Sequence, residues 1–386
     1  MKVLYIYDHK FITNNGNYFS EGKFSNKIFT RYDCLKANIV IISRKINSEQ
    51  VEYYNKIDKE NIKFSPVKGV KFYFIFSTYF FINLVKIAYY IVRSDLLIVR
   101  MPSILGLFVL SINLIFKKKY AVELVGNGRE AWFNIKSKNS YFYKKIAILL
   151  DKIRKFHIFN ANGVIYVTKK DLQKYYPTKG FVAVASNVEV NVEKNFYLDR
   201  KAEARDYYKI GLIGSFNNEY KGIETAIKAI KILKDQGVNS KLNIVGSGKL
   251  KEYYLNLAKR LDIEHDIIFL GSIKGGENIF QWLDSLDVYI QPSYTEGLPR
   301  ALIEAMSRGL PAIATQVGGI PELLDKEYLI PPKDHKRLAL SLINLLGDSH
   351  ERYNQSRKNF EQVKYYDSNY LTQQREIFWK KFKSIN

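Results

Sequence analysis

The sequence predicts an α/β protein of two doubly wound domains that face each other across a cleft. Apolar strand-like runs alternate with helix-length segments, a pattern typical of parallel sheets covered by helices. The strands of the second half are followed at once by Gly, Ser or Pro, the positions where open α/β sheets bind ligands. The length of 386 residues is enough for two domains, and the pattern restarts near Lys209.

The predicted strands fall into two sets. The first set is KVLYIY (2–7), NIVIIS (38–43), DLLIVR (95–100), YAVELVG (120–126) and GVIYVT (163–168). The second is KIGLIGS (209–215), KLNIVGS (241–247), IIFLGS (267–272), DVYIQPS (287–293) and PAIAT (311–315). A charged stretch without a strong period, VEKNFYLDRKAEARDYY, separates them and is the candidate linker. We expect domains over residues 1–195 and 206–366, and a C-terminal helix over 367–386 that returns toward the first domain.

Composition excludes several classes of protein. Hydrophobic residues make up 47% and charged residues 25%, which excludes a disordered, collagenous or fibrous chain. The single cysteine, Cys34, excludes a disulfide framework. Five scattered histidines and one cysteine also argue against a thiolate zinc site or a catalytic metal cage.

The net charge of +22 is concentrated in the first half of the chain. Residues 1–200 hold 33 Lys and Arg against 15 Asp and Glu, whereas residues 201–386 hold 27 against 23. An acidic partner, either nucleic acid or an anionic membrane, would therefore meet mainly the first half. The sequence has no zinc-finger spacing, no RNP-like aromatic motif and no Gly-x-x-Gly clamp in a suitable setting, which disfavours nucleic acid.

One apolar segment raises the question of a membrane span. MKVLYIYDHK lacks a leader-length apolar run, so we expect the chain to begin in the cytoplasm as a strand. Residues 72–85 are uncharged, but Lys86 follows and a span takes about 20 apolar residues. A buried or membrane-surface helix is the better interpretation. Residues 104–116 are apolar and end in three lysines, and 136–155 mix basic residues with an apolar stripe. Core helices with solvated basic faces are the alternative.

Two glycine-containing turns indicate an anion site in the second half. The run ending at Gly214 leads through SFNNEYKG to Lys221 and then to a helix-like segment. A lysine at a helix start opposes the helix dipole, but it becomes favourable when an anion also binds there. Gly246 and Gly248 end the next strand and would let a ligand approach the backbone. Ordinary strand-to-helix turns are the alternative explanation.

Residues 291–324 carry the strongest pattern, QPSYTEGLPRALIEAMSRGLPAIATQVGGIPELL. Glu296 precedes a Gly-Leu-Pro turn, Pro299 suits the start of a helix, and Glu304 lies eight residues after Glu296. Amides of Gly297, Leu298 and Arg300 would point out of the helix start, where an anion binds. The two carboxylates could then reach different hydroxyl-rich parts of one elongated ligand, with a phosphate between sugar and ribose. A capping acid at 296 and a solvated residue at 304 are the alternatives.

This pattern resembles the retaining glycosyltransferases of family 4. The Glu-x7-Glu motif is followed by Ala-Met-x-x-Gly-x-Pro-x-Ile-Ala and Val-Gly-Gly-x-Pro-Glu-Leu. The family has the GT-B fold, and the resemblance covers Met1–Tyr7 and Tyr207–Leu329. VELVGNGREAWFN, YVTKKDLQKYYPTKG and EGLPRALIEAMSRG look most like enzymes that build bacterial capsular polysaccharide or O-antigen.

The resemblance implies a role for particular residues. Lys221 would contact the donor pyrophosphate, Glu296 would hold sugar hydroxyls, and Glu304 would bind the ribose; Glu296 and Lys221 are the catalytic candidates. The further donor-binding candidates are Gly16, Gly214, Ser215, Gly246, Gly271, Ile273, Gly297, Leu298 and Pro299. Gly16 looks like a remnant of the family's Gly-rich loop near the diphosphate, and Gly271 to Ile273 would border the base. Gly126 and Asn127 are candidates on the acceptor side.

Three positions depart from the family pattern. Ser215 stands where an Arg is common, one Gly near residue 16 replaces a pair, and Asn127 lies where many members have an active-site His. His157 falls in a helix-like segment and is interpreted as structural. Asp-x-Asp does not occur in the sequence, so a metal clamp on the diphosphate is not expected.

The sequence therefore predicts a metal-independent, retaining glycosyltransferase (hexosyltransferase class). It would move a sugar from a nucleoside diphosphate sugar to a lipid-linked oligosaccharide in bacterial surface polysaccharide synthesis. It would lie in the cytoplasm, peripherally on the inner face of the cell membrane, with the basic first half on the anionic surface. A related GT-B enzyme that acts on soluble acceptors, or a nucleotide-sugar epimerase, is a second possibility; the Glu-x7-Glu pattern disfavours the epimerase. The alternative from another class is a catalytically degenerate GT-B-like subunit that binds donor or membrane without transfer.

Overall fold

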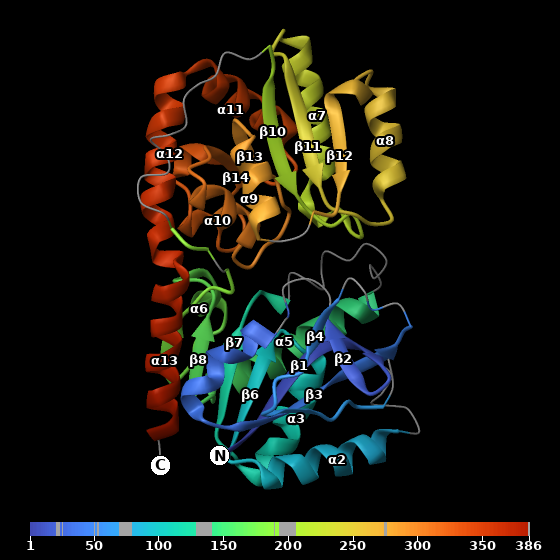
Figure 1. Cartoon of the computed structure of the whole chain (residues 1–386), viewed down its shortest axis with the longest axis vertical. Coiled ribbons are helices and arrows are strands. Elements are labelled where there is room, and N and C mark those ends of the chain that lie inside the picture. Colours follow the sequence, from blue (N-terminus) through green and yellow to red (C-terminus); the bar gives the residue numbers. More distant parts are fainter. Residues whose placement is uncertain are drawn as a thin grey trace. The chain divides into compact units, whose positions relative to one another are not determined.

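The structure is a computed structural model that forms two compact units (Figure 1). It describes residues 1–20, 24, 26–49, 51, 54–68, 79–128, 141–188, 190–192, 206–273 and 276–384. Unit 1 comprises Met1–Ser186 and Thr372–Asn386, and unit 2 comprises Asn187–Leu371. Most of the candidate linker, residues 193–205, lies outside the described residues. The C-terminal helix α13 (Ser368–Ser384) belongs to unit 1 from Thr372 onward.

Unit 1 is built on a mainly parallel sheet that contains all five predicted strands of the first half. Pairing runs β5-β3-β1-β6-β7-β8-β9 through the parallel strands. β6 carries the run LLIVRM, in which every residue is buried, as expected for a strand covered on both faces. The strands are β1 (Lys2–Asn14), β3 (Asn38–Asn47), β5 (Ile62–Phe64), β6 (Leu96–Met101), β7 (Tyr120–Leu124), β8 (Gly163–Tyr166) and β9 (Phe181–Val184).

The first strand is longer than the sequence pattern predicts. β1 pairs with β6 only over Val3 to Ile6, shifts register against β3 between Ile6 and Lys10, and continues to Asn14. A two-residue turn, Asn15-Gly16, with φ of 47° and 77° then leads into antiparallel β2 (Asn17–Ser20), which pairs with β4 (Asn55–Ile57). Positive φ at both positions is the signature of a tight β-hairpin.

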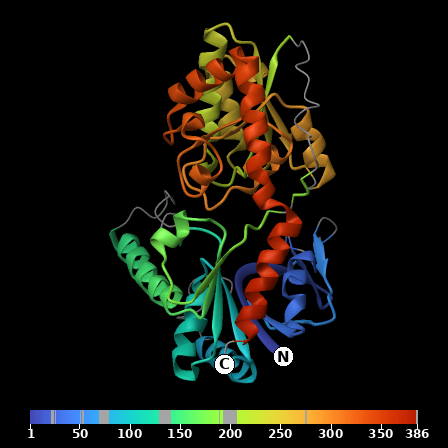
Figure 2. The same ribbon diagram turned by 90° about the vertical axis from the view of Figure 1, so that its left-hand side faces the viewer.

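Helices cover both faces of the unit 1 sheet. α3 (Ile104–Phe116) and α5 (Tyr141–Phe159) connect strands that step in one direction along the sheet, so right-handed crossovers put them on one face. α3 contacts both α5 and α2 (Phe80–Arg93). The 3₁₀ helix η1 (Thr30–Leu35) and α13 share the other face, where Tyr32 meets Trp379. Figure 2 shows α5 (green) and the blue N-terminal elements on opposite sides of the unit. Two short helices, α1 (Asn26–Phe29) and α6 (Asp171–Tyr175), complete the unit.

Unit 2 is a six-stranded parallel sheet with the order β12-β11-β10-β13-β14-β15. Numbered within the unit, this order is 3-2-1-4-5-6, that of a doubly wound dinucleotide-binding sheet. Both units therefore confirm the predicted fold class. The strands are β10 (Tyr208–Ile213), β11 (Ser240–Val245), β12 (Ile267–Gly271), β13 (Val288–Gln291), β14 (Ala312–Thr315) and β15 (Leu329–Ile330).

The core of unit 2 lies between the strands and the apolar faces of the helices. In α7 (Ile223–Asp235), buried Ile223, Ile227 and Ile230 recur at helical spacing and pack against β10 and β11. An Asp directly precedes each of α11 (His335–Gly347) and α12 (Ser349–Val363). Its side chain accepts a hydrogen bond from the backbone N–H three residues later. The other helices are α8 (Lys251–Arg260), α9 (Glu277–Asp284), α10 (Arg300–Ser307), η5 (Glu219–Lys221), η6 (Glu264–Asp266), η7 (Ile320–Glu322), η8 (Lys326–Tyr328) and η9 (Lys364–Tyr366).

The apolar run at residues 72–85 is described only from Tyr79 onward, where it forms the start of α2. None of the described helices is both long and apolar enough to traverse a lipid bilayer.

Candidate active site in the second unit

The candidate site lies where the strand order of unit 2 reverses. β10 and β13 are neighbours at the centre of the sheet, and the chain leaves them toward opposite edges. Lys221 follows β10 and Glu296 follows β13. Loops that leave adjacent strands in opposite directions open a crevice at their carboxyl ends, where doubly wound sheets bind ligands. Two residues 75 positions apart are thereby brought together.

Lys221 and Glu296 form an ion pair that is largely shielded from water. The Lys221 Nζ lies 2.7 Å from the Glu296 Oε1, and the side chains are 17% and 10% exposed. Gln291 Nε2 at 3.0 Å and Ser293 Oγ at 2.7 Å donate to the same oxygen. Within the described part of the chain, Oε2 makes no hydrogen bond. One oxygen therefore fixes the carboxylate, and the other remains able to accept from a ligand hydroxyl.

Sequence reasoning missed the residues that orient Glu296. Gln291 and Ser293 also bond to each other at 2.8 Å, and the Tyr289 hydroxyl donates to Gln291 Oε1 at 2.9 Å. Burial raises the pKa of Tyr289 well above its ordinary value, so its hydroxyl keeps its proton as a donor. The polar end of the run DVYIQPS, which finishes three residues before Glu296, could have indicated them. The alternative that Glu296 caps the following helix is wrong, because α10 has no side-chain cap.

Glycines bring the strand ends of the site into backbone contact. The Gly246 N–H donates to Gly271 O at 2.8 Å, and the Gly214 N–H donates to Val245 O at 2.9 Å. Gly246 has φ of 146°, and a Cβ there would lie 1.8 Å from Gly214 O. A side chain at Gly246 would therefore force the loops after β10 and β11 apart, which accounts for a glycine at this position.

The Gly-Gly turn at 318 and 319 supports the backbone of Glu296. The Gly319 N–H donates to Gly297 O at 2.7 Å, and a Cβ at Gly318 would lie 2.0 Å from Glu296 O. Gly318 also has φ of 53°, a left-handed conformation that costs other residues about 1–2 kcal/mol.

We expect Gly318→Ala to lower both stability and donor binding. The matched control is Gly237→Ala, because Gly237 has φ of 75° but nothing within 4 Å of an added Cβ. Chemical denaturation should show a loss of about 1 kcal/mol for the control and about 2–4 kcal/mol for Gly318→Ala, since the overlap adds to the conformational cost. Equal losses in the two variants would show that the contact with Glu296 is easily relieved.

α10 places the second glutamate and the predicted anion-binding amides. Pro299 precedes its first residue, Arg300, and the N–H groups of Gly297 and Leu298 make no hydrogen bond within the described residues. Such amides are suited to an anionic group. Glu304 lies in the second turn and is 6% exposed, so the alternative of a solvated helix residue is wrong. A carboxylate that serves only solubility lies on the surface, so the burial of Glu304 is better explained by a binding role.

The other predicted donor residues lie on the same edge of the unit 2 sheet. Ser215 follows Gly214, and its hydroxyl accepts from the Asn217 N–H at 3.3 Å. Gly271 ends β12 with φ of 70°, and Ile273 is half-buried two residues later. Ser272 and Ser247 join the loops after β12 and β11 through a 3.0 Å hydroxyl bond. The structure thus joins Lys221 to Glu296 and brings Gly246 against Gly214 and Gly271, while Ser215 and Ile273 lie at the same edge.

Three candidates lie in unit 1. Gly16 occupies the turn between β1 and β2, because β1 continues as a hairpin strand. Gly126 and Asn127 follow β7, and the Asn127 Oδ1 accepts from the Tyr176 hydroxyl at 2.9 Å. His157 is buried on α5 beside Ser111, and burial lowers the pKa of its imidazole to about 4.

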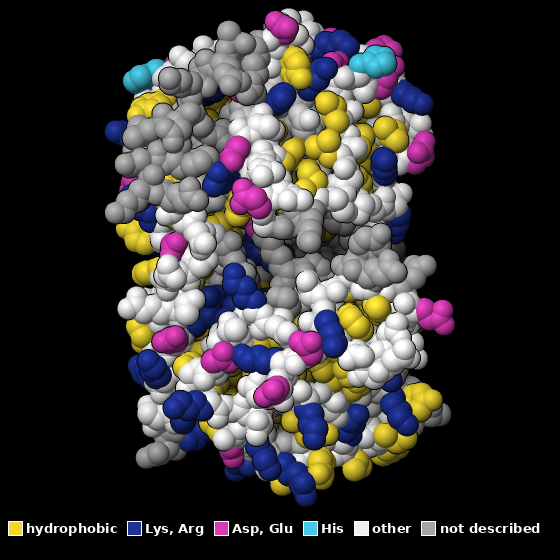
Figure 3. Space-filling model, viewed as in Figure 1, with side chains coloured by type: hydrophobic (Ala, Val, Ile, Leu, Met, Phe, Trp, Pro, Cys, Tyr) yellow, Lys and Arg dark blue, Asp and Glu magenta, His cyan; other side chains and the backbone are white. Residues whose placement is uncertain are grey.

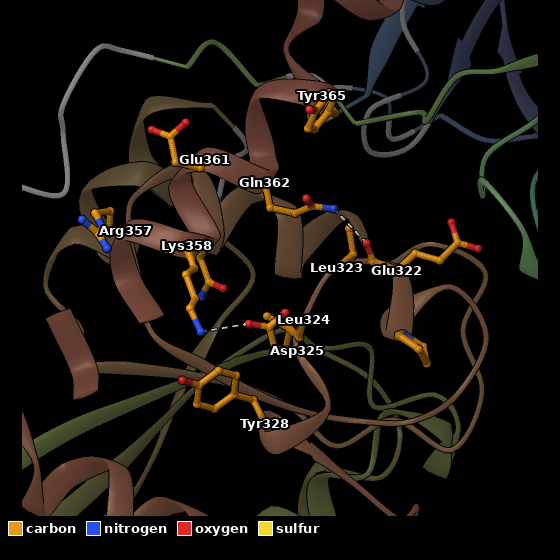
Figure 4. A pocket seen from close by; sticks show the side chains of 12 residues that line it. Glu322, Leu323, Leu324, Asp325, Tyr328, Arg357, Lys358, Glu361, Gln362 and Tyr365 are labelled. Carbon is orange, nitrogen blue, oxygen red and sulfur yellow. Dashed lines mark hydrogen bonds and ion pairs between the residues drawn. The ribbon is translucent and has the colours of Figure 1, made fainter. Parts of the chain in front are cut away.

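An open groove of about 810 Å³ lies elsewhere in unit 2, between α12 and the segment Pro321–Tyr328 (Figure 4). Lys358 pairs with Asp325 across it at 3.2 Å, and the Gln362 side chain donates to Glu322 O at 2.9 Å. No predicted site residue lines this groove. In the described ranges, no cluster of three or more His, Cys, Asp or Glu could hold a metal ion.

Comparison with known proteins agrees with this architecture. Residues 193–363 match the family model described as glycosyl transferases group 1. Protein CapJ of Staphylococcus aureus is 36% identical over 349 residues, which cover 89% of this chain and 86% of CapJ. The putative colanic acid biosynthesis glycosyltransferase WcaL of Escherichia coli is 35% identical over 32% of each chain.

Solved structures show the same fold over the whole chain. Sucrose-phosphate synthase of Thermosynechococcus elongatus superposes with a TM-score of 0.74 at 16% identity, covering 100% of this chain and 99% of that one. Anabaena HepE in complex with UDP-glucose superposes with a TM-score of 0.67 at 15% identity, covering 99% and 100%. The fold class is therefore that of the GT-B glycosyltransferases. Within that class, the chain belongs to the group 1 glycosyl transferases, consistent with glycosyltransferase family 4.

Proposed function

We propose that this protein transfers a sugar, with retention of configuration and without a metal ion, from a nucleoside diphosphate sugar to a lipid-linked oligosaccharide. The observation that carries the proposal is the Lys221–Glu296 pair at the switch point of unit 2, with one carboxylate oxygen still unbonded among the described residues. A role in bacterial capsule or exopolysaccharide synthesis is supported by the similarity to CapJ over most of the chain and to WcaL over part of it.

The site has the groups that departure of a nucleoside diphosphate requires. Negative charge grows on the diphosphate as the glycosidic bond breaks, and fixed positive charge and N–H groups stabilise it. Lys221 supplies the charge, and the Gly297 and Leu298 amides supply donors at the start of α10. Such a cradle stabilises a diphosphate electrostatically, which supports transfer without a metal.

Glu296 is better suited to hold the donor sugar than to attack it. Its Oε1 accepts three hydrogen bonds, one of them from an ammonium group, which makes that oxygen a poor nucleophile. Its Oε2 can accept from sugar hydroxyls. In a retaining transfer without a protein nucleophile, the acceptor attacks on the face from which the diphosphate leaves. NMR of the anomeric proton of the product would distinguish retention from inversion.

The remaining donor contacts follow from the places of the residues on the sheet edge. Glu304 is buried in α10 and is proposed to bind the ribose, while Gly271 to Ile273 at the end of β12 would border the base. Recognition of a nucleoside needs a hydrogen-bond acceptor for the ribose hydroxyls, which Glu304 would supply, and a backbone segment beside the base, which Gly271 to Ile273 would supply. The acceptor side is assigned to unit 1 through Gly126 and Asn127.

A degenerate subunit that binds donor without transfer is the second candidate. Ser215 and Asn127 favour it, because they replace residues common in the family. The intact Lys221–Glu296 pair and the buried Glu304 disfavour it, since a subunit without catalysis would not need a fixed carboxylate beside a cation.

Thermal stabilisation by UDP-, GDP-, ADP- and TDP-sugars in the presence of EDTA is the first test. A ligand present at about 100 times its Kd stabilises the folded state by about 2.7 kcal/mol, which is a shift of several degrees. We expect one donor class to stabilise the protein, and added Mg²⁺ to leave that shift unchanged. If no donor shifts the melting temperature, the proposal fails; if a shift appears only with Mg²⁺, metal independence fails.

A further inference from the structure

The outer face of α2 is apolar although it lies on the surface of unit 1. Asn83, Ile87 and Ile91 are buried at a spacing of four residues and hold the helix against the unit. Phe81, Val85 and Tyr89 recur at the same spacing on the opposite side. Phe81 is 73% exposed and Val85 is 68% exposed. An isolated exposed apolar residue needs no explanation, but a continuous stripe marks an interaction surface.

The same face of the unit continues over α3 and α5. α3 packs on both α2 and α5, and its last turn carries the exposed residues Leu114 and Ile115, the latter 77% exposed. On α5, Leu149 and Phe156 are exposed, and so are Lys145, Lys152 and Lys155. The outer face of α5 therefore mixes apolar and basic side chains. We call this surface of α2, the C-terminal turn of α3 and α5 the helical face.

The helical face carries positive charge with little to balance it. α2 and α3 contain no acidic residue. The one acid of α5, Asp151, is buried; its Oδ1 pairs with Arg154 at 2.8 Å and its Oδ2 lies 3.5 Å from the Lys155 Nζ, so this single carboxylate faces two basic groups. Arg93 and Lys117 stand exposed at the ends of α2 and α3. Figure 3 shows hydrophobic side chains interleaved with Lys and Arg along the lower edge of the molecule, over α2.

We propose that the helical face binds an anionic phospholipid bilayer by inserting the α2 stripe and the end of α3 into the interface while α5 contacts the headgroups. This inference rests on the proposed function, because a lipid-linked acceptor brings the enzyme to a bilayer. Apolar and aromatic side chains on one side of a surface helix, flanked by Lys and Arg, are the composition of interfacial helices. The basic residues add attraction to anionic lipid.

A bilayer fits this surface better than a second copy of the chain. A homodimer interface would bring the lysines of α5 and Lys117 toward the same residues of the partner or toward an equally basic neighbouring surface. Like charges across an interface oppose association, whereas an anionic leaflet balances them. The apolar stripe of α2 and the basic residues of the helical face then bind the same partner.

Flotation with vesicles of phosphatidylcholine alone or with phosphatidylglycerol tests the proposal on the full chain. We expect binding to the anionic vesicles to be at least 10-fold tighter, on the order expected when several lysines meet anionic lipid. Phe81→Gln with Val85→Gln, which leaves the charge unchanged, should weaken binding by about 10-fold or more. Replacing two exposed lysines of α5, as Lys144→Gln with Lys152→Gln, should weaken it by about 30-fold at low salt.

Matched controls change the same residue types elsewhere. Leu340→Gln with Ile377→Gln replaces two exposed apolar residues outside the helical face, and Lys259→Gln with Lys336→Gln removes two exposed lysines of unit 2. Neither pair should alter binding by more than about twofold, which is the range of surface substitutions without a role. All four variants alter exposed side chains, so circular dichroism should show native folding.

Salt separates insertion from simple charge attraction. At about 1 M salt the Debye length falls to about 3 Å, and purely electrostatic binding is lost. The wild-type chain should keep part of its binding, and the Phe81→Gln, Val85→Gln variant should lose it. Complete loss in the wild type would overturn insertion.

Two further outcomes would overturn the proposal. One is the absence of vesicle binding by the wild type. The other is a concentration-dependent dimer that the Phe81→Gln, Val85→Gln variant abolishes, which would assign the face to a second copy. The donor panel on the same preparation distinguishes the proposals: donor stabilisation without vesicle binding contradicts only the helical face, and vesicle binding without donor stabilisation contradicts only the proposed transfer.

Discussion

Replacing Glu296 by Ala is expected to lower transferase turnover by about 1000-fold or more. The substitution removes the proposed acceptor for sugar hydroxyls, and it also removes the anchor that holds the Lys221 Nζ at 2.7 Å. Loss of one preorganised group in a catalytic site costs about 100- to 1000-fold, and here two functions depend on one carboxylate. Turnover is measured with the donor selected by thermal stabilisation and a lipid-linked acceptor.

The fold should survive this change. Gln291 and Ser293 lose a hydrogen-bond partner but keep their mutual bond at 2.8 Å, so we expect a stability loss of about 1–3 kcal/mol. Glu327→Ala is the control, because that side chain is 59% exposed and its ion pair is loose at 3.6 Å. Glu296→Gln, which keeps an oxygen for Lys221, should fall between the two. Turnover near that of the control would remove Glu296 from the active site.

Replacing Lys221 by Ala is expected to lower turnover by about 100- to 1000-fold, with a smaller effect on donor affinity. In the proposed mechanism the ammonium group stabilises negative charge that grows on the diphosphate only as the bond breaks, so its loss raises the free energy of the transition state more than that of the bound ground state. Steady-state kinetics should therefore show a fall in kcat that exceeds the rise in KM.

Lys228→Ala is the matched control for Lys221→Ala. Lys228 also pairs with a glutamate, Glu224 at 2.6 Å, but it lies on the outer side of α7 and is 39% exposed. Its loss should leave turnover within about twofold and stability within about 0.5 kcal/mol. A double variant lacking Lys221 and Glu296 should be little worse than the worse single variant, because the two act as a unit. Additive losses would show that they act independently.

Much of the fold was predictable because parallel strands buried on both faces leave a strong sequence signal. Each predicted run from KVLYIY to PAIAT became a strand, since continuous apolar segments of this length suit the interior of a covered sheet. The extension of β1 into a hairpin was not predictable from the run KVLYIY, because Asp8 and His9 interrupt its apolar pattern and only pairing with β3 and β2 carries the strand on.

The candidate site was predictable in its residue types and not in its contacts. Lys221 and Glu296 stand out because each is a charged residue next to a glycine in a turn that follows a strand-like run, and Glu304 stands out because it lies eight residues after Glu296. That the Lys221 ammonium meets Glu296, and that Gln291 and Ser293 bond to the same oxygen, depends on β10 and β13 being neighbours. Strand order is a long-range property that local pattern does not encode.

The sequence by itself determined the fold class, the family and the glutamate pair, because hydrophobic periodicity and the motif from Glu296 to Glu304 are local features of the sequence. It also indicated a basic first half and, in the apolar segment that begins at residue 72, a buried or membrane-surface helix. The tertiary structure alone decided which side of that helix is exposed, which oxygen of Glu296 is bound and which glycines touch backbone. The physical reason is that exposure and hydrogen bonding arise between segments far apart in sequence, once packing has chosen which faces meet.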